Sequence, residues 1–404
     1  MELLHQHFLQ ILSAVLHGRR DRLPDSIGQE QWQALFSLGQ LHKLLPMVYE
    51  GAYLKGALQT YPGLASTRSL VLRQIMEQTM KTSELQGLYK TLSAAGIKPL
   101  VLKGIVCRSL YPKADIRPSA DEDLLIRPED CSRCIELLLE LGYTQMGSDD
   151  GEITFVKPGS ALHIELHTAL FPQEQSYGSM NALFDGIFDR AGTMELGDAA
   201  LAVPDHTDHL LYLICHGLKH FLHSGFGIRQ VCDILLYARA WGHLVDWNRI
   251  ISGCRAVRGE VFAAALFHIG VNHLGFDADG LHLPESWREM ELCEVPLLDD
   301  ILRAGIYGTS TSARQHSSSI TLEAAGATMR GERAKGALSA ALFPPAVQLR
   351  GRYPYLKKHP WLLPVAWGSR ILGYKKGRAA SMEALQTGHS RLKLLEQYNI
   401  IEKT

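Results

Sequence analysis

Three acidic residues stand directly before an aliphatic run in IRPSADEDLLIRPED, residues 116–130. Residues two apart on a strand point to the same face, so Asp121 and Asp123 should project together while Glu122 points away. Two such carboxylates repel each other and are costly to desolvate unless a cation lies between them. The pattern predicts a divalent metal site, because Mg²⁺ is commonly held by one or two carboxylates plus substrate phosphates.

A third acid lies on a second alternating segment, ALHIELHTALF at 161–171. Glu165 stands among aliphatic residues, and His163 and His167 share its face by the same alternation. An acid in this position faces either solvent or the acidic pair, and we favour the acidic pair. Two ions about 3.5–4 Å apart in such a site can steady both the attacking and the departing oxygen in phosphoryl chemistry.

Groups suited to phosphate precede the acids. In VLKG, Lys103 could meet a phosphate, Gly104 could let backbone amides approach one, and the helix that follows would add its dipole. Arg117 adds a guanidinium whose geometry suits bidentate contact with a phosphate or acceptor. Both cations could instead be salt-bridge partners of the acids without a substrate role.

The segment LVLKGIVCRSLYPKADIRPSADEDLLIRPED, with HIELHTAL and DHLLYLICHGLKHF further on, resembles the uncharacterised nucleotidyltransferase family of the DNA polymerase β-like superfamily. Members read roughly as LKG, a Tyr-Pro, an Arg, and Asp-x-Asp followed by aliphatic residues. The resemblance covers most of the chain from about residue 35 and continues more loosely over 342–372.

This resemblance implies that Asp121 and Asp123 bind the metal, that Glu165 is the third acid, and that Gly104 is the remnant of a triphosphate-binding glycine turn. Three positions depart from the family pattern. Ile105 replaces a second glycine or serine, Glu122 replaces an aliphatic residue, and Glu165 replaces an aspartate.

The expected activity is Mg²⁺-dependent (or Mn²⁺-dependent) transfer of a nucleoside monophosphate from an NTP such as ATP to an acceptor hydroxyl, with release of pyrophosphate. By resemblance the acceptor is a peptide, protein or sugar. Substrate contacts are expected from Lys103, Gly104, Arg117 and His167. The alternative is a catalytically weakened nucleotide-binding module, or an antitoxin-like regulator.

The order of elements predicts an α+β fold with a small mixed-sheet nucleotidyltransferase core. We expect an N-terminal helical region at 1–90, the core at 91–204, a C-terminal helical region at 205–310, and a basic, aromatic helical tail at 321–404. The polar stretch GTSTSARQHSSSI, at 308–320, has the composition of a linker.

Two further groups of residues resemble metal ligands. His216, His220 and His223 fall on one helical stripe, a spacing that can bind zinc, but no HExxH arrangement accompanies them and packing or hydrogen bonding is enough to explain them. Cys131 and Cys134 form a single CxxC without a second pair, which is a poor zinc signal.

The tail mixes cations with aromatic residues. Such a mixture could dock on an anionic membrane, a peptide or RNA, but we favour a helical appendage that packs its tryptophans on the body and leaves the bases solvated. The residues concerned are Arg350, Arg352, Lys357, Lys358, Trp361, Trp367 and Arg370.

Composition limits the partners and the compartment. The 404 residues carry 41 basic and 42 acidic side chains, a formal charge of -1, so nothing in the balance demands nucleic acid. No run approaches the roughly 18 apolar residues of a membrane span, and the N-terminus lacks the features of a secretory signal. Seven cysteines, an odd number, indicate reduced thiols and a cytoplasmic protein.

Overall fold

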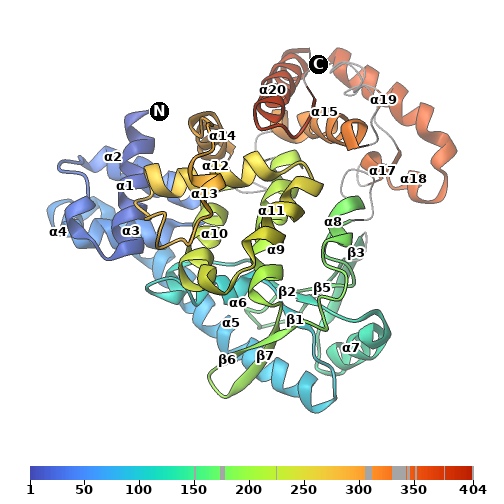
Figure 1. Ribbon diagram of the computed structural model, residues 1–404, viewed down its shortest axis with the longest axis horizontal. Coiled ribbons are helices and arrows are strands. Elements are labelled where there is room, and N and C mark those ends of the chain that lie inside the picture. Colours follow the sequence, from blue (N-terminus) through green and yellow to red (C-terminus); the bar gives the residue numbers. More distant parts are fainter. Residues whose placement is uncertain are drawn as a thin grey trace.

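A five-stranded mixed sheet carries the acidic residues and gives the predicted α+β fold (Figure 1). The computed structural model describes residues 1–149, 152–172, 178–223, 225–304, 312–329, 343, 346–350, 353–376 and 378–402. The strands follow the spatial order β1 (Leu100–Val101), β2 (Glu122–Leu125), β5 (Ile164–His167), β4 (Glu152–Val156) and β3 (Thr144–Asp149). β2 and β5 run parallel, and the other neighbouring pairs are antiparallel.

Two helical connections join these strands. α6 (Lys103–Arg108) lies between β1 and β2, and α7 (Pro128–Glu140) lies between β2 and β3. α7 begins with a proline, whose missing N–H costs nothing in the first turn of a helix, and continues with two acids that favour the positive end of its dipole.

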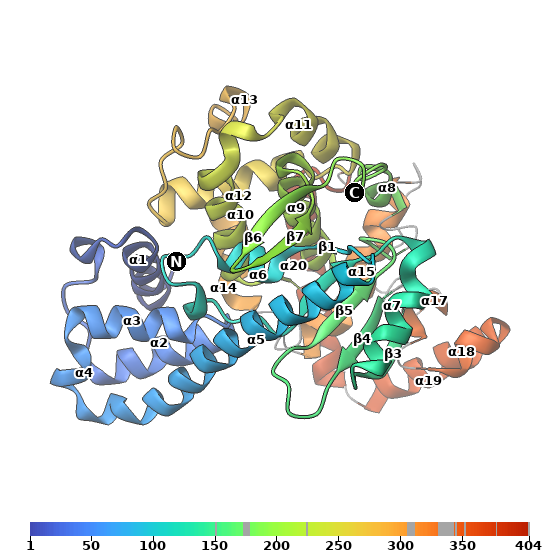
Figure 2. The same cartoon turned by 90° about the horizontal axis from the view of Figure 1, so that it is seen from below.

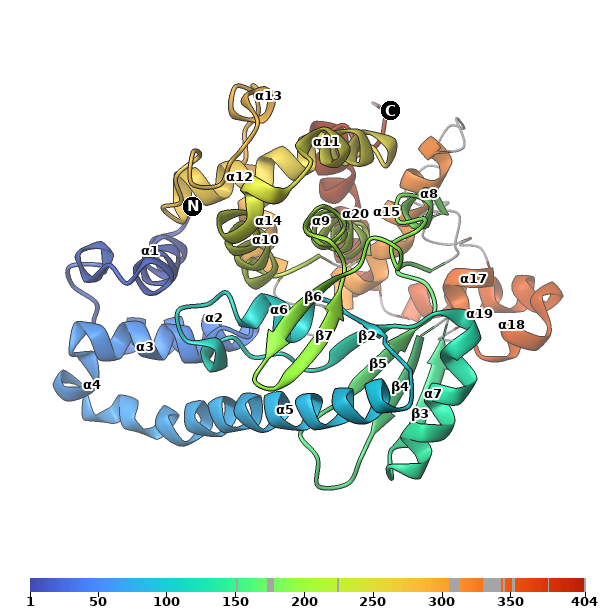
Figure 3. The same cartoon turned by 60° about the horizontal axis from the view of Figure 1, so that its bottom comes forward.

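The long helix α5 (Arg68–Ala94) crosses the predicted boundary at residue 90. In Figure 3 it runs along the molecule below the β6–β7 hairpin, while α9 to α12 lie above this hairpin. Glu84 of α5 accepts hydrogen bonds from the Ser160 hydroxyl at 2.5 Å and the Leu162 amide at 3.0 Å, just before β5 begins. The helix therefore anchors the strand that carries Glu165.

Helices precede and follow the sheets along the chain, and most buried hydrophobic residues, from Phe8 to Ile401 but without those of the tail around Leu349, form one continuous core. These helices are α1 (Leu3–His17), α2 (Gln29–Leu41), α3 (Leu45–Lys55), α4 (Ala57–Thr60), α8 (Gly178–Ala182), α9 (His206–His223), α10 (Ile228–Trp241), α11 (Trp247–Ala256), α12 (Glu260–His273), α13 (Glu285–Arg288) and α14 (Val295–Ala304). Short 3-10 helices lie at Arg20–Arg22, Pro62–Thr67, Ala114–Ile116, Gly242–Leu244 and Pro360–Leu362.

A two-stranded sheet that the sequence did not predict is formed by β6 (Gly192–Leu196) and β7 (Ala199–Val203). Gly197 has a φ of 60° in the tight turn between them, a conformation that glycine adopts without steric cost. The Ala202 amide donates to the Tyr89 hydroxyl of α5 at 2.7 Å, and Figure 2 shows the hairpin beside β1.

The predicted linker at 308–320 is wrong over 312–320, and 308–311 lie outside the described residues. Residues 312–320 form the first half of α15 (Ser312–Met329), which contacts α9 and α20 (Arg378–Gln397). The helix buries Ile320 at its middle and Leu322 and Ala324 in its second half, and the Thr321 hydroxyl donates to the Leu222 carbonyl at 2.5 Å. The tertiary contacts of the apolar second half therefore stabilise a helix that also includes residues 312–320, whose composition is that of a linker.

The basic, aromatic tail has its own small apolar cluster, Leu349, Leu356 and Ala366, formed by α17 (Ala346–Leu349), α18 (Tyr355–Lys358) and α19 (Leu363–Lys376). Trp367 is half-buried against this cluster of the tail and Trp361 is 73% exposed, so the expectation that the tryptophans pack on the body is wrong. Arg352 lies outside the described residues. None of the helices in the described part of the chain is long and apolar enough to cross a membrane.

Arg391 of α20 joins the C-terminal helices to α9. It is 2% exposed and donates to the carbonyls of His223, at 2.9 Å, and Phe221. We expect Arg391→Ala to lower the free energy of unfolding by about 2–3 kcal/mol, because charge-assisted hydrogen bonds to helix-end carbonyls are lost. The control is the exposed Lys393→Ala, expected within about 0.5 kcal/mol of wild type in urea unfolding. Equal midpoints for the two variants would contradict this role.

Candidate functional site

The parallel pairing of β2 with β5 brings three predicted residues together. Asp123 lies directly opposite Glu165 in the register, and His167 follows two residues later on the same face. Nε2 of His167 lies 3.2 Å from Oδ1 of Asp123 and 3.8 Å from Oε2 of Glu165. The ligand atoms of all three side chains lie within 4.8 Å of one another, the arrangement expected of a metal site.

Asp123 is a buried, ionised carboxylate. Its exposure is 1%, and Nζ of Lys103 lies 2.9 Å from its Oδ1. Burial alone would raise the pKa of Asp123, but the Lys103 ammonium and the His167 hydrogen bond hold it well below its usual range. The second oxygen, Oδ2, is buried and has no hydrogen-bond partner. Such an orphaned oxygen is costly to bury, so it is available to a cation.

Glu165 shows the opposite shift. Burial, followed by the negative charges of Asp123 and Asp121, raises the pKa of Glu165 to about 9. The site is therefore short of positive charge when it is made of protein groups alone. With the orphaned oxygen of Asp123, this carboxylate pair fits a divalent cation, which would satisfy both groups.

Of the predicted pair, Asp123 lies within β2 and Asp121 lies just before it. Asp121 is half-buried and precedes β2, and it is not a member of the cluster formed by Asp123, Glu165 and His167. Its charge nevertheless acts on Glu165. The difference arises because the strand begins at Glu122, so strand alternation does not extend to Asp121.

Two of the three predicted histidines on α9 form a chain of contacts that begins at Lys103. Nζ of Lys103 lies 2.9 Å from Nε2 of His216, which lies 3.2 Å from Nε2 of His220. Burial lowers the pKa of both histidines well below its usual value, so His216 is neutral and accepts from the ammonium. In the described part of the chain, the three histidines and the CxxC cysteines belong to no metal-ligating cluster.

The family comparison agrees with this geometry. The family model described as uncharacterised nucleotidyltransferase matches residues 28–274 of the 404. The chain belongs to the uncharacterised nucleotidyltransferase family. No curated protein matches it significantly. The match begins near the predicted start of the resemblance and ends before the tail, so it does not cover the looser likeness at 342–372. Nucleotidyl transfer is the general activity that this family supports.

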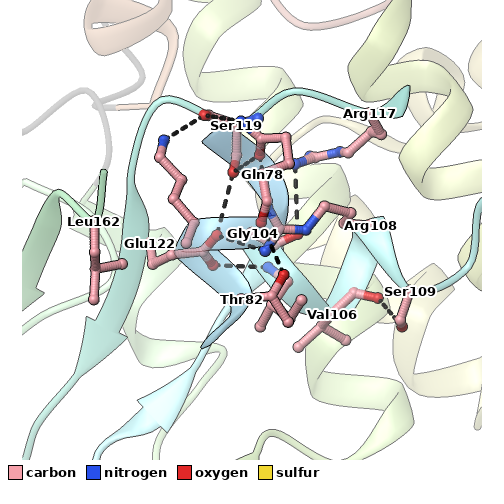
Figure 4. A network of polar contacts seen from close by, with 12 residues as sticks. Gln78, Thr82, Gly104, Val106, Arg108, Ser109, Arg117, Ser119, Glu122 and Leu162 are labelled. Atoms are coloured by element: carbon pink, nitrogen blue, oxygen red, sulfur yellow. Dashed lines mark hydrogen bonds and ion pairs between the residues drawn. The ribbon is translucent and has the colours of Figure 1, made fainter. Parts of the chain in front are cut away.

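The unusual Glu122 points away from Asp123, as strand alternation predicts. It is fully buried and accepts from the Ile105 amide at 2.7 Å, the Ser119 hydroxyl at 3.2 Å and Arg108 at 3.4 Å (Figure 4). Burial raises the pKa of Glu122 although Arg108 opposes the shift. The glutamate that departs from the family pattern thus belongs to a structural network behind the site.

This network explains Gly104. A Cβ atom on Gly104 would lie 1.9 Å from Oε2 of Glu122, so the position has no room for a side chain. The Ile105 amide at the start of α6 donates to Glu122, and the altered glycine turn therefore uses this amide internally. Lys81 of α5 completes the network by donating to the carbonyls of Ser119 and Ala120, each at 2.6 Å.

Arg117 is placed away from the acids. It is 3% exposed and forms a bidentate ion pair with Asp233 of α10, with its Nε at 3.0 Å and Nη2 at 2.5 Å from the carboxylate oxygens. The Tyr111 hydroxyl donates to the same carboxylate at 2.8 Å. Arg117 therefore forms a salt bridge, as the alternative interpretation of the sequence allowed. Its partner is Asp233, which the sequence did not suggest.

Two cations near the acids, Lys43 and Arg229, were not predicted from the sequence. Lys43, in the turn between α2 and α3, has a φ of 50° and is half-buried. Burial and the charge of Arg229 lower the pKa of Lys43, while the negative charges of Asp121 and Glu165 oppose this shift. Arg229 at the start of α10 donates to the Pro118 carbonyl, and its Nε is buried without a partner. No sequence spacing connects these residues to the acids.

We expect Gly104→Ala to destabilise the fold by about 1–3 kcal/mol or more, because the added methyl overlaps the Glu122 carboxylate. Gly87→Ala is the matched control: Gly87 lies inside α5 with nothing within 4 Å of its would-be Cβ, so a gain of about 0.5–1 kcal/mol is expected. Urea unfolding measures both. The cost of Gly104→Ala should shrink in a Glu122→Ala background, and an undiminished cost would locate the clash elsewhere.

Glu165 should also give the metal-free protein a measurable pH dependence. Between its ordinary value of 4.5 and about 9, the folded protein holds a proton that the unfolded chain releases, so this group's contribution to the free energy of unfolding falls as pH rises. Glu165→Gln should flatten that fall in urea unfolding with EDTA present. The exposed Glu195→Gln should not. An unchanged pH slope in Glu165→Gln would contradict the raised pKa.

Proposed function

We propose that the protein transfers a nucleoside monophosphate from an NTP to an acceptor hydroxyl and releases pyrophosphate. The observation that carries the proposal is the buried pair of carboxylates on adjacent parallel strands, Asp123 and Glu165, with one oxygen of Asp123 left without a partner. Family membership supports the general activity, and the site chemistry supports a divalent ion as its cofactor.

The ion, Mg²⁺ or Mn²⁺, would be held by Asp123 and Glu165 with Asp121 nearby, and would supply charge neutralisation for the triphosphate. In the transfer, the acceptor oxygen bonds to the α-phosphorus as the bond to the pyrophosphate oxygen breaks. The hydroxyl proton passes to a carboxylate near the acceptor, for which Glu165 is our candidate. The chain contributes positioning and charge compensation, which dominate catalysis of phosphoryl chemistry.

Cations around the acids would hold the phosphates. Lys103 is fixed between Asp123 and His216, which keeps its charge beside the ion site. Lys43 and Arg229 add positive charge on the side of Asp121 and Glu165, and the buried Nε of Arg229 has no protein partner. We assign these three residues to the triphosphate. Arg117 instead holds the segment before Asp121 against α10.

The acceptor remains a hydroxyl of a peptide, protein or sugar, and we place the reaction in the cytoplasm, where NTPs are available. The tail presents the exposed Trp361 close in sequence to Lys357 and Lys358, which suits peripheral contact with an anionic membrane surface or with the acceptor's carrier.

One observation favours the second candidate, a nucleotide-binding regulator without turnover. The Ile105 amide, at the position where the family's turn would meet phosphate, is already used by Glu122. A weakened triphosphate grip would leave binding without efficient transfer. The two candidates differ in pyrophosphate release, which only the enzyme gives.

The test incubates the full chain with each NTP, Mg²⁺ or Mn²⁺, and hydroxyl-bearing peptides, proteins and sugars, and measures pyrophosphate and an acceptor mass gain of one nucleotide. We expect Asp123→Asn and Glu165→Gln each to lower the rate by about 10²-fold or more, because charge compensation in the transition state is lost. The exposed Asp25→Asn and Glu195→Gln should retain the rate.

Nucleotide binding without pyrophosphate release under any of these conditions would favour the regulator. Full activity in a folded Asp123→Asn variant would overturn the assignment of the site.

A further inference from the structure

His167 distinguishes this site from one made of carboxylates alone. It projects from the same face of β5 as Glu165, and its Nε2 lies 3.2 Å from Asp123 and 3.8 Å from Glu165. Ligands that share one first-row metal ion at about 2.0–2.2 Å lie roughly 3–4.4 Å from each other. The ligand atoms of the three side chains lie within 4.8 Å of one another, close to the separations of ligands to a single ion.

The other ring nitrogen of His167 also has a suitable neighbour. Oε2 of Glu152 lies 4.0 Å from Nδ1, close enough for an ion pair but beyond hydrogen-bond distance, because the β4–β5 register sets Glu152 directly opposite His167. Histidines that bind metals usually donate their second ring N–H to a carboxylate, which fixes the tautomer and strengthens the ligand. With its proton on Nδ1 facing Glu152, His167 would present the Nε2 lone pair to the ion. This carboxylate is an observation independent of the three donors.

The chemistry of the donor set indicates which ions it selects. Mg²⁺ prefers oxygen ligands and gives up its water reluctantly, whereas imidazole suits first-row transition ions, and carboxylates and phosphates also suit Mn²⁺. We propose that His167 is a metal ligand through Nε2, supported by Glu152, and that the site therefore selects Mn²⁺ over Mg²⁺.

Lys103 is compatible with this arrangement. Its ammonium contacts Oδ1 of Asp123, while Oδ2 of the same carboxylate is buried without a partner. One oxygen can therefore remain with the protein cation while the other serves the ion. The role of the ion in catalysis rests on the proposed function, but the identity of its ligands does not.

The experiment uses the full chain, stripped with EDTA and titrated with Mn²⁺ while EPR follows the free ion, with Mg²⁺ as competitor. Electron spin-echo modulation of the bound Mn²⁺ then tests for ¹⁴N coupling, and ¹⁵N-histidine labelling confirms its source. We expect a nitrogen-coupled ion that binds at least about 10-fold more tightly than Mg²⁺.

The variants assign the nitrogen. His167→Gln should abolish the coupling and weaken Mn²⁺ binding about 10-fold or more, while changing Mg²⁺ binding much less. Glu152→Gln should weaken Mn²⁺ binding by about 10-fold, as expected for loss of a supporting carboxylate. His163→Gln is the matched control, because His163 lies on the same segment two residues before Glu165, is exposed, and should leave both ions unaffected.

Each outcome of these experiments either supports or overturns the assignment of His167 as a metal ligand. Bound Mn²⁺ without nitrogen coupling, no bound Mn²⁺, or equal losses of Mn²⁺ and Mg²⁺ affinity in His167→Gln would overturn the inference. Nucleotide transfer accompanied by a nitrogen-free ion would overturn it while leaving the proposed function intact. A nitrogen-coupled ion in a protein that transfers no nucleotide would support the metal site and count against the transferase.

Discussion

The site depends on one constraint: two carboxylates are held side by side in a buried position by the backbone pairing of parallel strands. Because Asp123 and Glu165 are register partners, neither can move away from the other without breaking the hydrogen bonds of β2 and β5. Their opposite pKa shifts follow from this enforced proximity, since the positive charge of Lys103 reaches one acid more effectively than the other. The fold therefore holds two carboxylates close together, and a divalent cation can relieve their repulsion.

The other face of β2 explains how the strand is held in place. Glu122 points into the network of α5 and α6, and Gly104 has no side chain because that carboxylate lies against its backbone. Glu122 thus fixes the segment that precedes the strand through the Ile105 amide and the close approach of Gly104. Glu122, which faces the supporting network, and Asp123, which faces the site, are neighbours on β2. A substitution of Glu122 should therefore also shift the position of Asp123.

Strand alternation explains which parts of the site were predictable. Asp123, Glu165 and His167 follow from a period of two residues, and the helix expected after Lys103 and Gly104 is α6, which begins at Lys103. The role predicted for Asp121 stays a prediction, because β2 begins at Glu122 and its alternation does not place the Asp121 side chain. The partner of Arg117 could not be predicted, since Asp233 lies more than a hundred residues away and meets it only through the docking of α10.

The same limit applies to the fold. The order of elements predicted the α+β fold, but not the β6–β7 hairpin, which depends on contact with α5 and β1. The polar start of α15 shows composition being overridden by tertiary contact, because the helix is secured by its apolar second half. Periodicity reports which face of an element is buried, but it carries no information about the distant element that buries it.

These long-range contacts also assemble the site from regions that the sequence separates. The acids come from the sheet, Lys103 from α6, His216 from α9, Arg229 from α10, and Lys43 from the N-terminal helices. Carboxylates brought together by strand pairing would be unstable without these cations, and the cations would repel one another without the acids. The helical regions are therefore part of the electrostatic balance of the site, and a nucleotidyltransferase sheet isolated from them would keep its negative charges and lose the positive charges that offset them.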